Sequence, residues 1–280
     1  MLPWVQSSPV ALRMPDTRTL PTELLWNLTL RELRGRFKRS ALGWLWSIIN
    51  PLSLIAIYSL VVGEFIGIEP PVGVPSGIDV YGFFLVSGLL PWMYLTNSLN
   101  GAVASIVGNE GLVKKVYFPR SVLPGASTLA WLANFGVELL VLLVVLLAFG
   151  HMVLPWLPAV VGLMILQTGF LLGLSLLLSA ANAYFRDIQH FLGIFLNIWF
   201  YATPILYPAN LVTEKSELAG FFLLKLNPMA RFVDAYRAAL YDLRWPTLSQ
   251  WAALLVVSVV TLALGAAAFR RLEPGLAEEL

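Results

Sequence analysis

Six long apolar stretches constrain the fold of this chain more than any other feature of its sequence. They run over residues 44–66, 80–107, 121–149, 153–182, 190–208 and 249–269. About 20 apolar residues in a helix cross the hydrocarbon core of a bilayer, which is about 30 Å thick. Only 12% of the 280 residues are charged, against about a quarter in an ordinary soluble domain. The sequence therefore predicts an all-α integral membrane protein, with a six-span transmembrane domain over residues 44–270.

The positions of lysine and arginine predict how these helices are oriented. Basic residues beside a membrane span tend to stay in the cytoplasm. If both termini are cytoplasmic, the inner segments carry 13 of the 18 basic residues, and residues 271–280 form a cytoplasmic tail. The first outer loop carries Glu64, Glu69 and Asp79 and no basic residue. We therefore expect a multi-pass protein with both termini inside.

Residues 22–38 are predicted to form an amphipathic helix that lies in the membrane interface. One apolar stripe at helical spacing consists of Trp26, Leu30, Leu33 and Phe37. Basic residues lie off this stripe, at Arg31, Arg34, Arg36 and Lys38. An apolar stripe with basic flanks is typical of interfacial helices. The sequence of the N-terminal extension, residues 1–21, predicts no structure or role for this segment.

A second non-spanning helix is expected outside the membrane, within residues 209–248. Asn227 and Pro228 suit the N-cap and first position of a helix. Met229, Phe232, Val233, Tyr236 and Leu240 then share an apolar face, which should enter the outer leaflet or pack on the bundle. Arg231, Asp234 and Arg237 should occupy the opposite face, at spacings that permit ion pairs.

The sequence has none of the motifs that would let this chain supply its own chemistry. It contains no G-x-x-x-x-G-K-[ST] loop, no H-E-x-x-H and no G-x-S-x-G. Cysteine is absent, and two histidines are too few for a metal site. The net charge of +2 gives no reason to expect nucleic acid. We expect no catalytic residue, metal or cofactor in this chain, and an energy source in a partner.

Five segments, in this order, carry a resemblance to a known family. They are RELRGRFKRSALGWLWSIINPL at Arg31–Leu52, YFPRSVLP at Tyr117–Pro124, YFRDI at Tyr184–Ile188, TPILYP at Thr203–Pro208 and NPMARFVDAYR at Asn227–Arg237. Together they resemble the membrane permease subunit of ABC type-2 exporters of polysaccharides and polyol-phosphate polymers, such as O-antigen, capsule, teichoic acid and galactan. The resemblance covers about residues 22–270.

The resemblance implies a function and a set of partners. The chain would be the permease of an ATP-driven exporter in a bacterial inner membrane. It would form a homodimer with two copies of a separate ATPase, which binds ATP and Mg. The cargo would be a polymer linked to a polyprenyl pyrophosphate lipid, moved from the cytoplasm to the outer face.

The resemblance also implies roles for particular segments. The coupling segment, residues 108–120, would place Leu112, Val113, Lys114, Lys115, Val116 and Tyr117 in a cleft of the ATPase. Arg186 and Asp187 would lie at the cytoplasmic mouth. Two short re-entrant helices of the outer leaflet, within residues 209–241, would form an outer gate with Met229, Phe232, Val233 and Tyr236.

Two sets of residues are candidates for substrate contact. The basic cluster Arg31, Arg34, Arg36, Lys38 and Arg39 suits a pyrophosphate at the substrate entrance, or serves only as an anchor to anionic lipid. Tyr58, Trp131, Glu138 and Trp199 are channel candidates, because sugar rings stack on aromatic planes. Aromatic residues also form ordinary interfacial belts. Glu138 can instead make a structural bond, for example with Asn134 one turn earlier.

Three other classes of protein fit parts of the sequence. One is an ABC exporter permease for a drug or a small lipid. Another is a membrane-embedded polyprenyl-phosphate glycosyltransferase, although only Glu110 and Asp187 are available as acids in the inner loops. The third is a membrane scaffold without a transport role.

Overall fold

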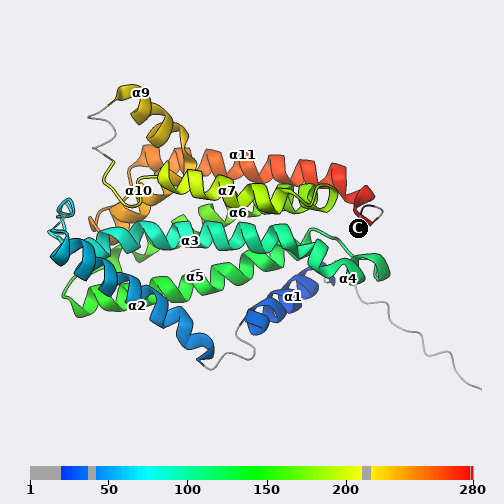
Figure 1. Cartoon of the computed structure of the whole chain (residues 1–280), viewed down its shortest axis with the longest axis horizontal. Coiled ribbons are helices and arrows are strands. Elements are labelled where there is room, and N and C mark those ends of the chain that lie inside the picture. Colours follow the sequence, from blue (N-terminus) through cyan, green and yellow to red (C-terminus); the bar gives the residue numbers. More distant parts are fainter. Residues whose placement is uncertain (1–19, 37–41, 68, 210–215, 278, 280) are drawn as a thin grey trace, which may run out of the picture.

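The computed structural model describes residues 20–36, 42–67, 69–209, 216–277 and 279. Within these ranges every regular element is helical, and no strand is present (Figure 1). Six helices lie in the six predicted apolar stretches: α2 (Trp46–Tyr58, continued by a π-helical segment, Ser59–Phe65), α3 (Tyr81–Ser105), α5 (Val122–Ala148), α6 (Leu157–Tyr184), α7 (Ile188–Tyr201) and α11 (Leu248–Leu272). The other α-helices are α1 (Leu20–Arg36), α4 (Glu110–Lys115), α9 (Glu217–Gly220, continued by a π-helical segment, Phe221–Leu226) and α10 (Pro228–Leu240).

Four helical segments in the described part of the chain are long and apolar enough to cross a membrane. They are Trp46–Phe65, Val122–Ala148, Leu154–Tyr184 and Leu248–Leu276. Helix α3 has 25 residues but a more polar sequence, and α7 has only 14 residues. At about 1.5 Å per residue, α7 is about 21 Å long, which is short of the hydrocarbon thickness. Four candidate spans agree with a multi-pass architecture, while six spans remain a prediction.

The fifth apolar stretch, residues 190–208, is helical only as far as Tyr201, ahead of its Thr203-Pro204 and Tyr207-Pro208 breaks. Helix α7 ends at Tyr201, and Thr203 to Ile205 follow as an irregular turn. A proline disfavours helical geometry in the residue before it, which explains why the helix ends ahead of Pro204. Pro51 and Pro91, by contrast, lie inside α2 and α3.

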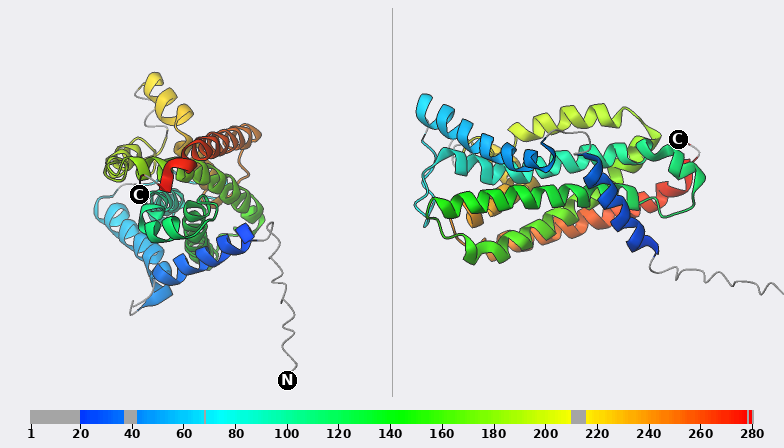
Figure 2. Two further views of the ribbon diagram at one scale, coloured as in Figure 1. Left: turned by 90° about the vertical axis from the view of Figure 1, so that its right-hand side faces the viewer. Right: turned by 90° about the horizontal axis from the view of Figure 1, so that it is seen from below.

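Helix α3 lies at the centre of the bundle, and the others surround it (Figure 2). The main core contains side chains of α3, α5, α6 and α10. Helices α6 and α11 lie against each other at Gly173 and Gly265, where a Cβ on either residue would collide with the other backbone. Close approach through small residues is typical of helix pairs in membranes.

A second apolar cluster lies at the end of the bundle that carries α4 and the C-terminus, here called the α4 end (Figure 1). Its buried members are Leu28, Ile106, Val113, Val122, Leu123, Ala126, Ala180, Ala183, Phe269 and Leu276. They come from α1, α4, α5, α6, α11 and the segments that adjoin them. This cluster therefore joins the predicted interfacial helix to the predicted coupling segment.

A helix, α1, is present where the interfacial helix is predicted, and it packs across α5 (Figure 2). Its bundle side is formed by Leu25, Leu28 and Thr29 rather than by the predicted stripe. Trp26 of that stripe is 64% exposed. The helix thus has two apolar sides, one against the protein and one free to contact lipid. Phe37, Lys38 and Arg39 lie outside the described residues.

Helix α10 begins as predicted, because the Asn227 side chain accepts hydrogen bonds from the amides of Met229, at 3.0 Å, and Ala230, at 3.4 Å. Its apolar face packs on the bundle, and the proposed gate residues Met229, Phe232, Val233 and Tyr236 are each 0% exposed. Of the two expected locations for this face, the structure selects packing against α3 and α6.

The predicted place of Arg237 on the opposite face of α10 is wrong, and the ion pairs that the spacing permits do not form among the described residues. Arg237 is buried and donates to the carbonyls of Phe84, Pro204 and Ile205, at 3.3, 2.5 and 2.6 Å. Asp234 accepts from Gln250 instead, at 2.5 Å, and Arg231 donates to the carbonyl of Lys225. The irregular turn after α7 exposes carbonyls that no helix satisfies, and Arg237 is the side chain that reaches them.

Candidate functional site

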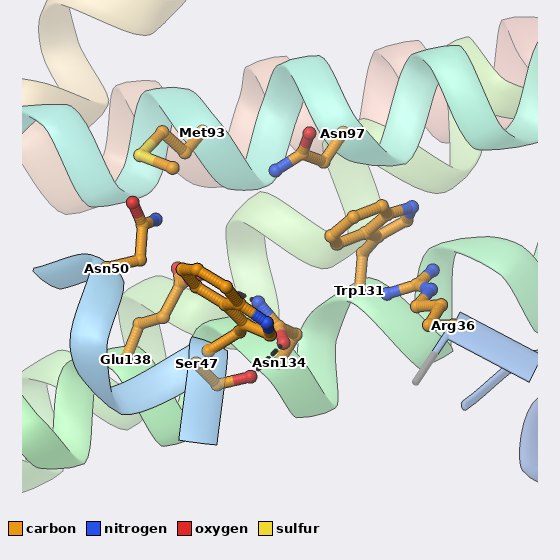
Figure 3. Close-up of a pocket in the computed structure, with 9 residues that line it drawn as sticks. Arg36, Ser47, Asn50, Met93, Asn97, Trp131, Asn134 and Glu138 are labelled. Carbon is orange, nitrogen blue, oxygen red and sulfur yellow. Dashed lines mark hydrogen bonds between the residues drawn. The ribbon is translucent and has the colours of Figure 1, made fainter. Parts of the chain in front are cut away.

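A cavity of about 440 Å³ lies among the end of α1 and helices α2, α3 and α5 (Figure 3). Its lining residues are Arg36, Trp46, Ser47, Asn50, Met93, Asn97, Trp131, Asn134 and Glu138, here called the polar pocket. This volume falls within the range of about 300–1,000 Å³ that is usual for sites of small molecules. Three amides, a carboxylate and a guanidinium thus gather between helices that are otherwise apolar.

A hydrogen-bond chain crosses one wall of the polar pocket. The Ser47 hydroxyl donates to Asn134 Oδ1 at 2.7 Å, and Asn134 Nδ2 donates to Glu138 Oε1 at 2.8 Å. All three side chains are buried, at 3%, 7% and 4% exposure. The predicted bond between Asn134 and Glu138 is confirmed, and Ser47 extends it to α2. An acidic side chain within an apolar helix is costly, so partners of this kind stabilise it.

Arg36 enters the polar pocket from the last turn of α1, beside Trp131 (Figure 3). Its guanidinium carbon lies 3.4 Å from the centroid of the Trp131 ring, which makes a cation–π contact. Burial lowers the pKa of Arg36 to about 10, against the opposing effect of Glu32, so the group is charged at neutral pH. Its Nη1 atom is buried and has no hydrogen-bond partner among the described residues. Arg36 therefore keeps one donor unpaired, although protein atoms cover it in this structure.

The other two described members of the basic cluster, Arg31 and Arg34, do not line the polar pocket. Arg31 Nη2 donates to Asn109 Oδ1 at 2.8 Å and lies 3.2 Å from a Glu32 carboxylate oxygen. Arg34 is exposed. Of the residues described here, only Arg36 connects the basic cluster to the pocket.

Two of the four channel candidates lie elsewhere. Trp199 donates its indole N–H to Asn227 Oδ1 at 2.8 Å, and its ring meets Trp92 edge to face at 5.8 Å. It therefore joins α7 to the start of α10. Tyr58 is half-buried on α2, against the main core. Neither lines the polar pocket, and their channel role stays a prediction.

Sequence reasoning missed several pocket residues. Ser47, Asn50, Met93 and Asn97 were not among the candidates, although they form the walls from α2 and α3. Isolated asparagines are unusual in apolar stretches, because each amide must find a partner away from water. Asn50 and Asn97 carry that signal in the sequence, whereas nothing local reveals that they face one cavity.

The predicted coupling segment forms a short helix, α4, with a buried side and an exposed side. Val113 belongs to the second apolar cluster, and Leu112 packs against it. Lys114 and Glu110 form an ion pair at 2.6 Å, one turn apart. Lys115, Val116 and Tyr117 are exposed, and the Tyr117 side chain is 102% exposed. A fully exposed tyrosine beside a packed helix is available to a partner.

The predicted cytoplasmic mouth adjoins α4. Arg186 and Asp187 are exposed in the turn between α6 and α7. The hydrogen bond and charge of Lys114 lower the pKa of Glu110, and the charge of Arg186 adds to this effect. Arg186 is therefore close enough to α4 to influence it, and the two predicted regions share the α4 end.

These features define a helical membrane protein with a polar pocket inside one bundle and an exposed short helix at one end. The family model described as ABC-2 type transporter matches residues 23–241. The chain belongs to this family, and the resemblance inferred from its motifs is confirmed.

Curated relatives show the same similarity over most of the chain. It is 36% identical over 262 residues to the O-antigen export system permease protein RfbA of Myxococcus xanthus, covering 92% of this chain and 95% of that protein. It is 31% identical to the protein of the same name from Klebsiella pneumoniae, covering 77% and 79%. It is 26% identical to the polysialic acid transport protein KpsM of Escherichia coli, covering 89% and 93%.

Proposed function

We propose that this chain is the permease of an ATP-driven exporter that moves a lipid-linked polysaccharide out of the cytoplasm. The observation that carries the proposal is the similarity to an O-antigen export permease, at 36% identity over nearly the whole chain. A homodimer of this chain would span an inner membrane with six helices per subunit and both termini inside. Two copies of a separate ATPase, holding ATP and Mg, would engage α4. The α9 and α10 region would form the outer gate.

The polar pocket suits the end of the polymer that joins its lipid. Arg36 carries a positive charge and a free donor, which favour a pyrophosphate. The ring of Trp131 and the amides of Asn50 and Asn97 offer a stacking plane and hydrogen-bonding groups to the adjoining sugars. Glu138 would contribute an acceptor at the far end of the pocket. The first sugars and their phosphates would occupy this pocket on the way to the channel.

The function is tested by deleting the gene in its host. We expect surface polysaccharide to disappear and lipid-linked polymer to accumulate in the inner leaflet. Unchanged surface polysaccharide, with retention of a drug or a small lipid instead, would overturn the polymer and support the rival exporter. Reconstitution of the permease with its ATPase in proteoliposomes provides the direct assay of export.

The role of Arg36 is tested by Arg36→Ala, with Arg34→Ala as the matched control from the same helix. Loss of a charge-assisted contact should raise the half-saturating concentration of lipid-linked substrate roughly tenfold or more. Arg34 is exposed, so its variant should leave that concentration unchanged. If both variants instead reduce membrane insertion slightly and equally, and neither changes the half-saturating concentration, the basic cluster serves as a lipid anchor.

The role of Glu138 is tested by Glu138→Gln. The carboxamide can still accept the hydrogen bond of Asn134 but carries no charge, so structure and charge are separated. Ser47→Ala removes a bond of the same chain without changing charge. If Glu138 contacts cargo, the first variant slows export while the second does not. Export at the wild-type rate in Glu138→Gln would assign Glu138 a structural role only.

A further inference from the structure

We infer that Arg31 is a positioning residue that connects α4 to α1, so that movement of α4 reaches the polar pocket. This inference rests on the proposed function, since it requires a partner that drives α4. It separates Arg31 from the substrate-binding role that its place in the basic cluster suggests.

The first observation is a direct bond between the two elements. Arg31 Nη2 donates to Asn109 Oδ1 at 2.8 Å, across 78 residues of sequence. Asn109 immediately precedes α4, and its Nδ2 donates to the carbonyl of Ser105 at 2.7 Å, at the end of α3. Both ends of the Asn109 amide are thus engaged. The side chain is fixed between α3, α4 and α1.

The second observation is that α1 and α4 each contribute a buried side chain to the same apolar cluster. Leu28, one turn before Arg31, is 6% exposed, and Val113 of α4 is 4% exposed. Both belong to the second apolar cluster. Packed side chains transmit displacement because protein interiors compress little. The Arg31–Asn109 bond therefore joins α1 to the residue before α4, and both helices also pack into one apolar cluster.

The third observation concerns the other end of α1. Arg36 follows Arg31 by five residues, about 7.5 Å along a helix, and contacts Trp131 in the pocket wall. Arg31 and Arg36 lie on one continuous helix of 17 residues. A shift of α4 would thus move Arg36 relative to Trp131. The same movement of α4 would change the shape of the polar pocket, which in the proposed function holds the anionic end of the cargo.

The first test is a double-mutant cycle on the permease–ATPase complex in proteoliposomes. Its variants are Arg31→Ala, Asn109→Ala and the double substitution, with Arg34→Ala as the control. The readouts are ATP hydrolysis, polymer exported per ATP and the half-saturating substrate concentration. We expect each single variant to lower export per ATP roughly two- to fivefold, as for a partly exposed charged contact. The double variant should be no worse, because both remove the same bond.

The outcomes separate the possible roles of Arg31. A raised half-saturating concentration in Arg31→Ala, with Asn109→Ala unaffected, would make Arg31 a ligand contact and overturn the inference. Additive losses in the double variant would overturn it as well. Failure of the wild-type complex to export polymer would refute the proposed function itself, which is a different result.

The second test uses the absence of native cysteine, which gives a background free of other thiols. In the Arg31→Cys and Asn109→Cys double variant, a short reducible bis-methanethiosulfonate linker replaces the bond. Because the two elements should move together, linked protein should recover export per ATP, and reduction should abolish the recovery. If the link instead blocks export while hydrolysis continues, α1 and α4 must separate during transport, and the inference fails.

Discussion

Arg237→Met should destabilise the end of the bundle that carries α10. Arg237 is 8% exposed and donates to two carbonyls of the turn after α7, those of Pro204 and Ile205. Its guanidinium carbon also lies 3.8 Å from the centroid of the Phe84 ring. Methionine fills a similar volume with a flexible apolar chain, so the substitution removes the donors with little change in packing.

The expected loss follows from the groups left without partners. Each buried carbonyl that loses its donor costs about 1–3 kcal/mol, and the lost cation–π contact adds about 1–2 kcal/mol. Part of this loss in free energy is offset, because the substitution also removes the cost of burying the charge of Arg237. We therefore expect the free energy of unfolding to fall by about 3 kcal/mol, toward the lower end of the range for broken buried charge contacts.

The measurement is unfolding by SDS of the purified permease in bicelles, followed by the fluorescence of its 10 tryptophans. The matched control is Arg231→Met, on the same helix, where the bonds to the Lys225 carbonyl are at the surface. That variant should change the free energy by no more than about 0.5 kcal/mol. A loss below about 1 kcal/mol in Arg237→Met would show that water satisfies these carbonyls, and the argument would be refuted.

Three further predictions use the same preparations. Gly265→Ala should lower the free energy of unfolding by about 1–3 kcal/mol, because its Cβ meets the backbone of Gly173; Gly108→Ala, with open space around it, is the control and should show no such clash. Asn227→Ala removes a helix cap and should cost about 1–2 kcal/mol in the same unfolding assay, and an equal stability would contradict the capping role. Tyr117→Ala should leave stability within about 0.5 kcal/mol but weaken ATPase binding roughly tenfold in a titration of the two subunits; unchanged affinity would place the docking surface elsewhere.

The features that could be predicted from the sequence depend on the length of apolar stretches and on interactions between residues that are close along the chain. Apolar length located α3 and α5 within one or two residues at each end and α6 within four, because each stretch ends where polar residues begin. The bond between Asn134 and Glu138 was predictable, since residues four apart share one side of a helix. The N-cap of α10 was predictable for the same reason, because Asn227 caps the helix that begins at the next residue. These features depend on neighbours along the chain and not on the arrangement of helices.

The features that were missed depend on contacts between distant segments. The bonds of Arg237 reach 33 and 153 residues away, so its neighbours in the sequence suggested only a solvated face. The polar pocket needs α2, α3 and α5 at particular rotations, which no single segment fixes. The buried side of α1 likewise follows from where α5 lies, so the sequence predicted the outward stripe that contains Trp26 but not the side formed by Leu25, Leu28 and Thr29.

The geometry of α1 also limits how the basic cluster can act on a substrate. Successive residues of a helix are about 100° apart, so Arg31 and Arg36 point about 140° away from each other. The bonds agree, since Arg31 reaches Asn109 while Arg36 reaches Trp131. One pyrophosphate therefore cannot take both guanidinium groups while α1 is helical. Alanine at the two positions should consequently give different defects: weaker substrate binding at Arg36, and fewer polymers exported per ATP at Arg31. Identical defects would mean that α1 unwinds around its ligand.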